Sequence, residues 1–181
     1  MIIKAIIFDL WGTLIFSELQ HGIAKKITRK LNLLNEKEFW HIFGETSCIS
    51  SSNDSLTMFT KICNRIGIKD EKLANELASI WNNIEIPIFS DTIPTLEKLK
   101  EGKNKLGLIS NTEDISAKRA LKKYNLKKYF DAIAFSYEIG LLKPNIGIFQ
   151  KLLDRLKIKP FEACIVDDSI NEGIKPGKPL E

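Results

Sequence analysis

Residues 2–14 read IIKAIIFDLWGTL, an apolar run followed by a polar turn. The isoleucine-rich part has the length and composition of a strand that is buried on both faces, as the strands of parallel sheets are. It ends at Asp9, and Gly12 marks a turn just beyond it. We therefore expect the first strand of a parallel sheet here, with Asp9 at its carboxyl end.

A helical pattern follows this strand. Apolar residues recur three or four positions apart along residues 16–88, which is the spacing of amphipathic helices. The polar, serine-rich stretch 44–54 predicts a loop, and Asp54 or one of the two residues beside it would cap the next helix. These features predict a four-helix insert.

After this insert, strand-like and helix-like segments alternate again. We predict strands near 105–109, 132–135 and 163–166, and helices near 93–100, 115–124 and 146–156. Such alternation implies right-handed parallel crossovers, so the carboxyl ends of the strands lie at one edge. The predicted fold is α/β: a Rossmann-like parallel sheet core at residues 1–15 and 89–181, with an inserted all-helical domain at residues 16–88.

The composition is that of an ordinary globular protein. The chain has 181 residues, of which 44% are hydrophobic and 28% charged, enough for one core plus a small module. It contains neither a signal-peptide pattern nor the roughly 20 uncharged apolar residues of a membrane helix, so we expect a cytoplasmic protein and no membrane partner. The three cysteines lack metal-site spacing. The net charge of +4 comes without aromatic partners for the basic residues, so we expect no nucleic-acid partner.

Residues that carry chemistry follow the predicted strands. Asp9 can act as a nucleophile toward phosphorus or carbon, because it is a carboxylate beside a turn that exposes backbone N–H groups. Ser110, the backbone of Asn111 and the Lys143 ammonium are natural donors to the charged oxygens of a transferring phosphoryl group. Because the carboxyl ends of parallel strands meet, we expect these residues to lie close together.

Three acids lie within six residues after the last predicted strand: Asp167, Asp168 and Glu172. Their mutual repulsion is costly unless a hard cation or a lysine lies among them. Mg²⁺ is the cation that we expect.

Together these segments resemble the four motifs of the haloacid dehalogenase (HAD) superfamily. The sequence DLWGTL at 9–14 is similar to the D-x-D-G-T-L loop of that family. The other three motifs are matched by LISNT at 108–112, by Lys143 within GLLKPN, and by IVDDS at 165–169 followed by Glu172.

The resemblance implies a role for each of these residues. Asp9, Ser110 and Lys143 would be catalytic, and Thr13 and Asn111 would bind the substrate. Mg²⁺ would be bound by the side chains of Asp9 and Asp168 and by the carbonyl of Trp11. Asp167 and Glu172 would act through water or hold Lys143 in place.

The resemblance also implies that the helical insert is a cap that closes over the strand ends, with hinges near 15–17 and 88–91. The cap would select a small-molecule substrate, most simply a phosphorylated one. Four of its side chains could face the cleft, but residues at helical spacing are more often core, so we assign none of them a catalytic role: His21, Trp40, His41 and Trp81.

Trp11 departs from the family pattern. In the phosphatases of the family this position holds a second aspartate, which protonates the leaving group and then activates water. An indole cannot transfer a proton in this way, and a positioned acid or base is typically worth about 10²–10⁴ in rate.

Three functions therefore stay open. The first is a Mg²⁺-dependent phosphatase or phosphotransferase that acts through an aspartyl-phosphate at Asp9 and is weakened by Trp11. The second is a 2-haloacid dehalogenase, because a halide leaves without a proton and dehalogenases carry an aromatic residue at this position. The third is a catalytically weak protein that binds a phosphate ligand or a partner. The acidic fourth motif favours the first.

The family's further strand after the fourth motif has no counterpart here, and Pro176 interrupts the helix predicted after Glu172. Three explanations stay open: a natural short form, a truncated chain, or a sheet edge covered by self-association in a homodimer.

Overall fold

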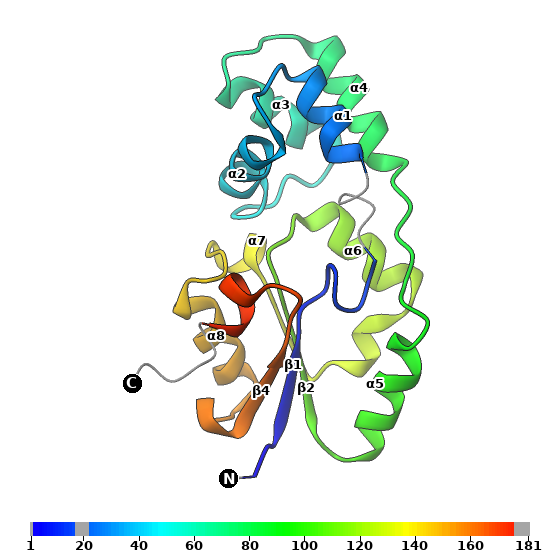
Figure 1. Cartoon of the computed structure of the whole chain (residues 1–181), viewed down its shortest axis with the longest axis vertical. Helices are drawn as coiled ribbons and strands as arrows, with labels where there is room; N and C mark the ends of the chain where they lie inside the picture. The colour runs from blue at the N-terminus through cyan, green and yellow to red at the C-terminus, as the bar shows by residue number, and fades with distance from the viewer. Residues whose placement is uncertain (1, 17–21, 176–181) are drawn as a thin grey trace.

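The computed structural model describes residues 2–16 and 22–175 and contains a four-stranded parallel sheet in the order β3-β2-β1-β4 (Figure 1). The strands are β1 (Ala5–Phe8), β2 (Lys105–Ser110), β3 (Ala132–Phe135) and β4 (Ala163–Val166). Because β1 pairs with both β2 and β4, Asp9 follows a central strand. The predicted α/β fold with a parallel sheet is confirmed.

Helices cover both faces of the sheet. They are α5 (Thr92–Glu101), α6 (Asp114–Lys123), α7 (Ser136–Ile139) and α8 (Ile146–Leu156), with 3₁₀ turns at Leu126–Tyr129 and Pro160–Glu162. Phe8 of β1 packs in one apolar cluster with Leu96 of α5, and its neighbour Ile7 packs in another with Ile148 of α8. Successive strand residues point to opposite faces, so β1 is buried on both sides, as its composition predicts.

The insert forms a helical segment with an apolar core of its own, which includes Phe39, Phe59 and Leu77. Its helices are α1 (Ile23–Lys30), α2 (Glu36–Ser47), α3 (Ser55–Arg65) and α4 (Glu71–Asn82). In Figure 1 this segment lies beyond the end of the sheet at which β1 ends. It is therefore above the residues that follow the strands.

One boundary prediction was wrong. Helix α2 continues to Ser47 and takes up the first residues of the predicted loop 44–54. The hydroxyl of Thr46 donates to the carbonyl of Ile42, one helical turn earlier, and Ser47 is buried. Burial against the rest of the helical segment outweighs the loop-like composition. The cap prediction holds, since the Asp54 side chain accepts from the Thr57 amide at the start of α3.

The two connections between the helical segment and the sheet run side by side. The Phe16 amide donates to the Pro87 carbonyl, and Ile15 forms an antiparallel bridge with Ile88. These contacts lie at the two predicted hinges, except that Ser17 is outside the described residues. The proposed division into a core and a cap stays a prediction.

Strand β4 lies at an edge of the sheet, and Val166 at its end is 40% exposed. A π-helical turn at Ile170–Ile174 follows it, while Pro176 lies outside the described residues. None of the helices in the described ranges is long and apolar enough to cross a membrane.

Candidate active site

A buried lysine joins two of the predicted acids at the carboxyl end of the sheet. The Lys143 Nζ atom lies 2.7 Å from Asp9 Oδ1 and 2.6 Å from Asp167 Oδ2. All three side chains are almost completely buried. A buried charge is tolerated only when it is paired, so these residues form one charge network in which a single cation lies between two carboxylates.

The pKa values of this network follow from burial and charge. Burial raises the pKa of Asp9 to about 6, although the Lys143 ammonium lowers it in part. For Lys143, burial lowers the pKa, but Asp9 and Asp167 more than offset this and the pKa ends above its usual value. At neutral pH the network is therefore an Asp9 carboxylate held against a protonated Lys143.

Asn111 fixes the backbone of Lys143. Its side-chain amide donates to the Lys143 carbonyl at 3.0 Å, and its side-chain oxygen accepts from the Lys143 amide at 2.7 Å. The side chain of Asn111 therefore positions the lysine. The substrate contact that we expect from the backbone of Asn111 stays a prediction.

The structure separates the roles of the three clustered acids. Asp167 holds Lys143 through one oxygen and accepts from the Ser169 amide through the other. Glu172 is exposed and accepts from the Asn111 side chain at 3.2 Å. Of the two residues that could hold Lys143, Asp167 is the one in direct contact with it.

Two buried hydroxyls in the predicted site have no hydrogen-bond partner. They belong to Thr13, in the turn after β1, and Ser110, at the end of β2. An unsatisfied buried hydroxyl is costly. A ligand with several acceptor oxygens, such as a phosphate, would satisfy both.

Asp168 lies against the turn that follows Asp9. Gly12 has a φ of +84°, and a Cβ atom there would lie 2.3 Å from Asp168 Oδ2, so only glycine allows this approach. Burial and the neighbouring Asp167 both raise the pKa of Asp168, and a bound cation would relieve that repulsion.

These carboxylates fit Mg²⁺, which prefers oxygen ligands and is usually bound by one or two carboxylates together with water and substrate phosphate. The described part of the chain contains no group of three or more acidic, histidine or cysteine side chains placed to hold a metal ion. Asp9, Asp168 and the Trp11 carbonyl stay the predicted ligands.

Trp11 is fixed to the neighbouring loop. Its indole Nε1 donates to Thr112 Oγ1 at 3.0 Å, and the Thr112 amide donates to Ser136 Oγ at 2.9 Å. The ring is only partly buried. Trp11 therefore contributes a rigid aromatic surface where a phosphatase of the usual pattern has an acid.

A cavity of about 670 Å³ separates the helical segment from the sheet. The residues of the sheet domain that line it include Trp11, Asn111, Thr112, Leu142, Lys143 and Glu172. The residues of the helical segment that line it include Lys37, Trp40, His41, Phe43, Gly44, Glu45, Cys48 and Trp81. Its volume is that of a site for a small organic molecule.

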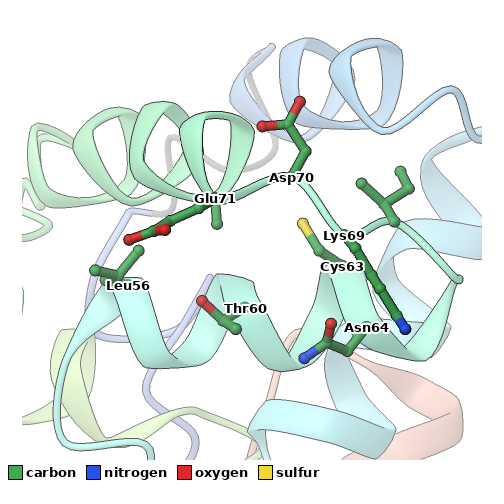
Figure 2. A pocket seen from close by; sticks show the side chains of 9 residues that line it. Leu56, Thr60, Cys63, Asn64, Lys69, Asp70 and Glu71 are labelled. Carbon is green, nitrogen blue, oxygen red and sulfur yellow. The ribbon is translucent and has the colours of Figure 1, made fainter.

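The aromatic residues of the insert that line the cavity differ in exposure. Trp81 is buried and donates to Glu113 and Ser116, whereas Trp40 is half-buried at the cavity wall and His41 is exposed there. His21 lies outside the described residues. A second cavity, of about 350 Å³, lies between α3 and α4 and contains none of the predicted site residues (Figure 2).

Sequence reasoning missed Asp114, the first residue of α6. Its buried carboxylate accepts from the Ser51 hydroxyl at 2.6 Å and from the Ser52 and Asn53 amides at 3.1 and 3.3 Å. Lys118 adds a further contact at 2.9 Å. Burial acts to raise the pKa of Asp114, but the hydrogen bonds from Ser51, Lys118 and Ser52 lower it by more. Asp114 thus binds the loop between α2 and α3 to α6, beside the sheet.

Glu113 forms a second link between the two parts. It caps α6 through the Ile115 and Ser116 amides, and it also accepts from Trp81 of the helical segment at 3.1 Å. A pair of acids before a helix signals a helix cap, but nothing in the sequence identifies partners more than 30 residues away.

The sequence is similar to proteins of known function. Residues 3–180 match the family model of haloacid dehalogenase-like hydrolases. A glyceraldehyde 3-phosphate phosphatase from Methanothermobacter thermautotrophicus is 29% identical over 181 residues, which covers 95% of this chain and 80% of the relative. An (S)-2-haloacid dehalogenase 4A from Burkholderia cepacia is 31% identical over 103 residues, which covers 56% of this chain and 44% of the relative.

Solved structures share the architecture. A HAD phosphatase from Thermococcus onnurineus has a TM-score of 0.63 and 25% identity, covering 98% of this chain and 83% of the other. A 2-haloacid dehalogenase from Pseudomonas syringae pv. Tomato DC3000 has a TM-score of 0.64 and 22% identity, covering 97% and 82%. Because phosphatases and dehalogenases both have this fold, the activity must be argued from the site.

Proposed function

The chain belongs to the haloacid dehalogenase-like hydrolases and is therefore a hydrolase, and we propose that it is a Mg²⁺-dependent phosphatase that acts through an aspartyl-phosphate at Asp9. The observation that carries this proposal is the buried pair of Asp9 and Lys143, 2.7 Å apart, together with the unpaired hydroxyls of Thr13 and Ser110. The pair supplies a nucleophile and a cation, and the hydroxyls supply donors for phosphate oxygens.

The reaction needs two displacements at phosphorus. A carboxylate oxygen of Asp9 bonds to phosphorus while the bond to the leaving oxygen breaks. The Lys143 ammonium and the hydroxyls of Thr13 and Ser110 donate to the phosphoryl oxygens as charge spreads over them. Water then attacks the aspartyl-phosphate, which releases inorganic phosphate and restores the Asp9 carboxylate.

Mg²⁺ bound by Asp9, Asp168 and the Trp11 carbonyl would neutralise charge on the phosphoryl oxygens. Asp167 keeps the Lys143 ammonium beside Asp9, and Asn111 holds the backbone of the lysine. The metal and the lysine together would balance the negative charge that a phosphate brings to two carboxylates.

Trp11 restricts the substrates that can react. Its indole N–H donates a hydrogen bond to Thr112, and it is not acidic enough to transfer its proton to a leaving oxygen. We therefore expect slow turnover of phosphates whose leaving group must be protonated as it departs.

The similarity to known proteins supports a phosphatase over a dehalogenase. The likeness to the glyceraldehyde 3-phosphate phosphatase covers 95% of this chain, whereas the likeness to the (S)-2-haloacid dehalogenase covers 56%. Asp168 also supports a metal site, because it lies against the turn after Asp9 and, unlike Asp167, does not pair with Lys143.

The decisive experiment is the hydrolysis of p-nitrophenyl phosphate with and without Mg²⁺. We expect metal-dependent release that falls at least about 10³-fold in Asp9→Asn, since loss of a covalent nucleophile is severe. Release should rise in Trp11→Asp because the new carboxylate can activate the water that hydrolyses the aspartyl-phosphate, although the p-nitrophenolate itself leaves without protonation. Asp91→Asn makes the same chemical change at an exposed position outside the site and should match the parent. Full activity in Asp9→Asn would refute the proposal.

A dehalogenase is the second candidate, and Trp11 is the observation that favours it, because a halide departs without a proton. This function requires halide release from short 2-haloacids that is independent of Mg²⁺ and lost in Asp9→Asn. Release of halide together with no turnover of the aryl phosphate would replace the first proposal with this one.

A further inference from the structure

The wall that the helical segment contributes to the cavity contains a cluster of tryptophan and phenylalanine rings beside polar side chains. The rings of Trp40 and Phe43, both on α2, are 5.6 Å apart in a T-shaped contact, and Phe43 is 5.0 Å from Trp81 of α4. These contacts hold the rings in place. From the opposite side, Trp11 lines the same cavity beside Lys143. A flat apolar group would therefore meet aromatic surfaces on both sides.

Gly44 sets the width of this cavity. It lies inside α2, where glycine is unfavourable relative to alanine. A Cβ atom at Gly44 would have one neighbour within 4 Å that is neither adjacent in the chain nor part of the helix backbone, the Leu142 Cδ1 atom at 3.4 Å. An alanine would therefore just touch Leu142, whereas a larger side chain would have to displace Leu142 or extend into the cavity that both residues line.

The chemistry of the site independently favours one kind of leaving group. The Trp11 side chain cannot protonate a leaving oxygen. A leaving group that departs readily as an anion is therefore favoured. A phenol has a pKa of about 10, well below the pKa of water or of an aliphatic alcohol. A phenolate therefore leaves without the missing acid, and an alkoxide does not.

We propose that the substrate is an aryl phosphate whose ring lies in this cavity between Trp11 and the aromatic wall of α2. The inference rests on the proposed phosphatase function. The phosphate would reach Asp9 and Lys143 while the ring stays among Trp11, Trp40 and Phe43. The bond between phosphorus and the aryl oxygen breaks, its electron pair leaves with the phenolate, and water supplies the proton that turns phenolate into phenol.

Three substrates separate ring binding from leaving-group chemistry. Acetyl phosphate has a good leaving group and no ring, benzyl phosphate has a ring and an alkoxide leaving group, and 2-naphthyl phosphate has both a ring and a phenolate leaving group. For the parent protein with Mg²⁺ we expect the lowest KM for 2-naphthyl phosphate. Benzyl phosphate should compete with it for binding but turn over at least about 100-fold more slowly, since it needs the acid that is missing.

Gly44→Leu tests the cavity itself. It should lower the ratio of kcat/KM for 2-naphthyl phosphate over that for acetyl phosphate by about tenfold or more, the scale of a blocked pocket. Gly44→Ala removes the glycine without filling the cavity and should change the ratio far less. Ser79→Leu enlarges an exposed position of α4 that does not line the cavity, and it should leave the ratio unchanged.

The outcomes distinguish this inference from the proposed function. If the parent hydrolyses acetyl phosphate but prefers benzyl to 2-naphthyl phosphate, or if Gly44→Leu keeps the parental ratio, the aryl phosphate inference fails and the phosphatase proposal stands. If none of the three phosphates is hydrolysed in the presence of Mg²⁺, the phosphatase proposal fails, and this inference fails with it.

Discussion

The two walls of the cavity are built from different interactions. The wall of the sheet domain is charged, with Lys143 within 2.7 Å of both Asp9 and Asp167. The wall of the helical segment carries aromatic rings, such as those of Trp40 and Phe43 in contact, beside the polar side chains of Lys37, His41 and Glu45. Charges positioned on rigid strand ends suit a reaction, and apolar rings suit recognition of a substrate body. The difference suggests that the sheet domain determines the reaction and the helical segment the substrate.

The largest expected difference is in the stability lost when an ion pair is broken at the site or in the helical segment. Lys143→Met would leave the Asp9 and Asp167 carboxylates buried without a cation, and removing one partner of a buried pair typically costs about 3–5 kcal/mol. We expect a loss of this size in the free energy of unfolding, measured by urea denaturation. Lys30→Met breaks the exposed pair with Glu76 in the helical segment, and it should change stability little. Equal effects of the two variants would contradict the buried charge network.

We expect Mg²⁺ to bind on the side of the sheet domain, where Asp168 lies, and not at the helical wall. At a Mg²⁺ concentration of 100 times the Kd, binding to the folded state adds about 2.7 kcal/mol of stability. We expect Mg²⁺ to raise the thermal unfolding midpoint of the parent, and this shift should disappear in Asp168→Ala. Glu45→Gln removes an exposed carboxylate from the helical wall of the cavity and should keep the shift. Persistence of the shift in Asp168→Ala would remove this residue from the metal site.

The sheet wall could be predicted from the sequence because its residues follow strands. A short apolar run ending in Asp9, and similar runs before Ser110 and Asp167, place these residues at one edge by topology alone. The sequence left two choices for the residue that holds Lys143, and the structure brings Asp167 to it at 2.6 Å. That choice depends on side-chain directions, which no spacing reveals.

The helical wall could not be predicted to the same degree. Trp40 and Trp81 both fit helical core spacing and both line the cavity, yet Trp81 is buried and Trp40 is half-buried. The position of the segment depends on links such as Asp114, whose partners in the loop before α3 lie more than 60 residues away. Contacts of this range leave no periodic signal in the chain.

The link at Asp114 should have a smaller effect than the site itself. Asp114→Ala would leave the buried Ser52 amide without its acceptor, and an unsatisfied buried group costs about 1–3 kcal/mol. We expect a loss of stability in this range and faster proteolysis of the loop at residues 48–54. Asp154→Ala removes an exposed carboxylate from α8 and should affect neither measurement. An unchanged rate of cleavage in Asp114→Ala would show that other contacts hold the loop.

The smallest expected effect is the pH dependence of the stability that two helix-capping acids contribute, Glu113 of α6 and Asp54 of α3. Burial raises the pKa of Glu113 at the start of α6, although hydrogen bonds from Ser116 and Trp81 oppose this. Stability from this group is therefore fully present below its ordinary pKa of 4.5 and is lost as the pH rises through the higher pKa of the folded state. Asp54, the exposed cap of α3, has the opposite sign because hydrogen bonds from Thr57 lower its pKa.

Urea denaturation between about pH 3 and pH 8 can separate these contributions, since this range spans the ordinary pKa values of acids. The stability of the parent minus that of Glu113→Gln should fall as the pH rises, whereas the parent minus Asp54→Asn should rise. The neighbouring Cys48 and Tyr137 have raised pKa values, so they stay neutral over this range and do not obscure the slope. If both differences rise with pH, the Glu113 carboxylate is better solvated in the folded protein than its position between α6 and Trp81 implies. The link between the two walls would then be looser than the contacts of Glu113 indicate.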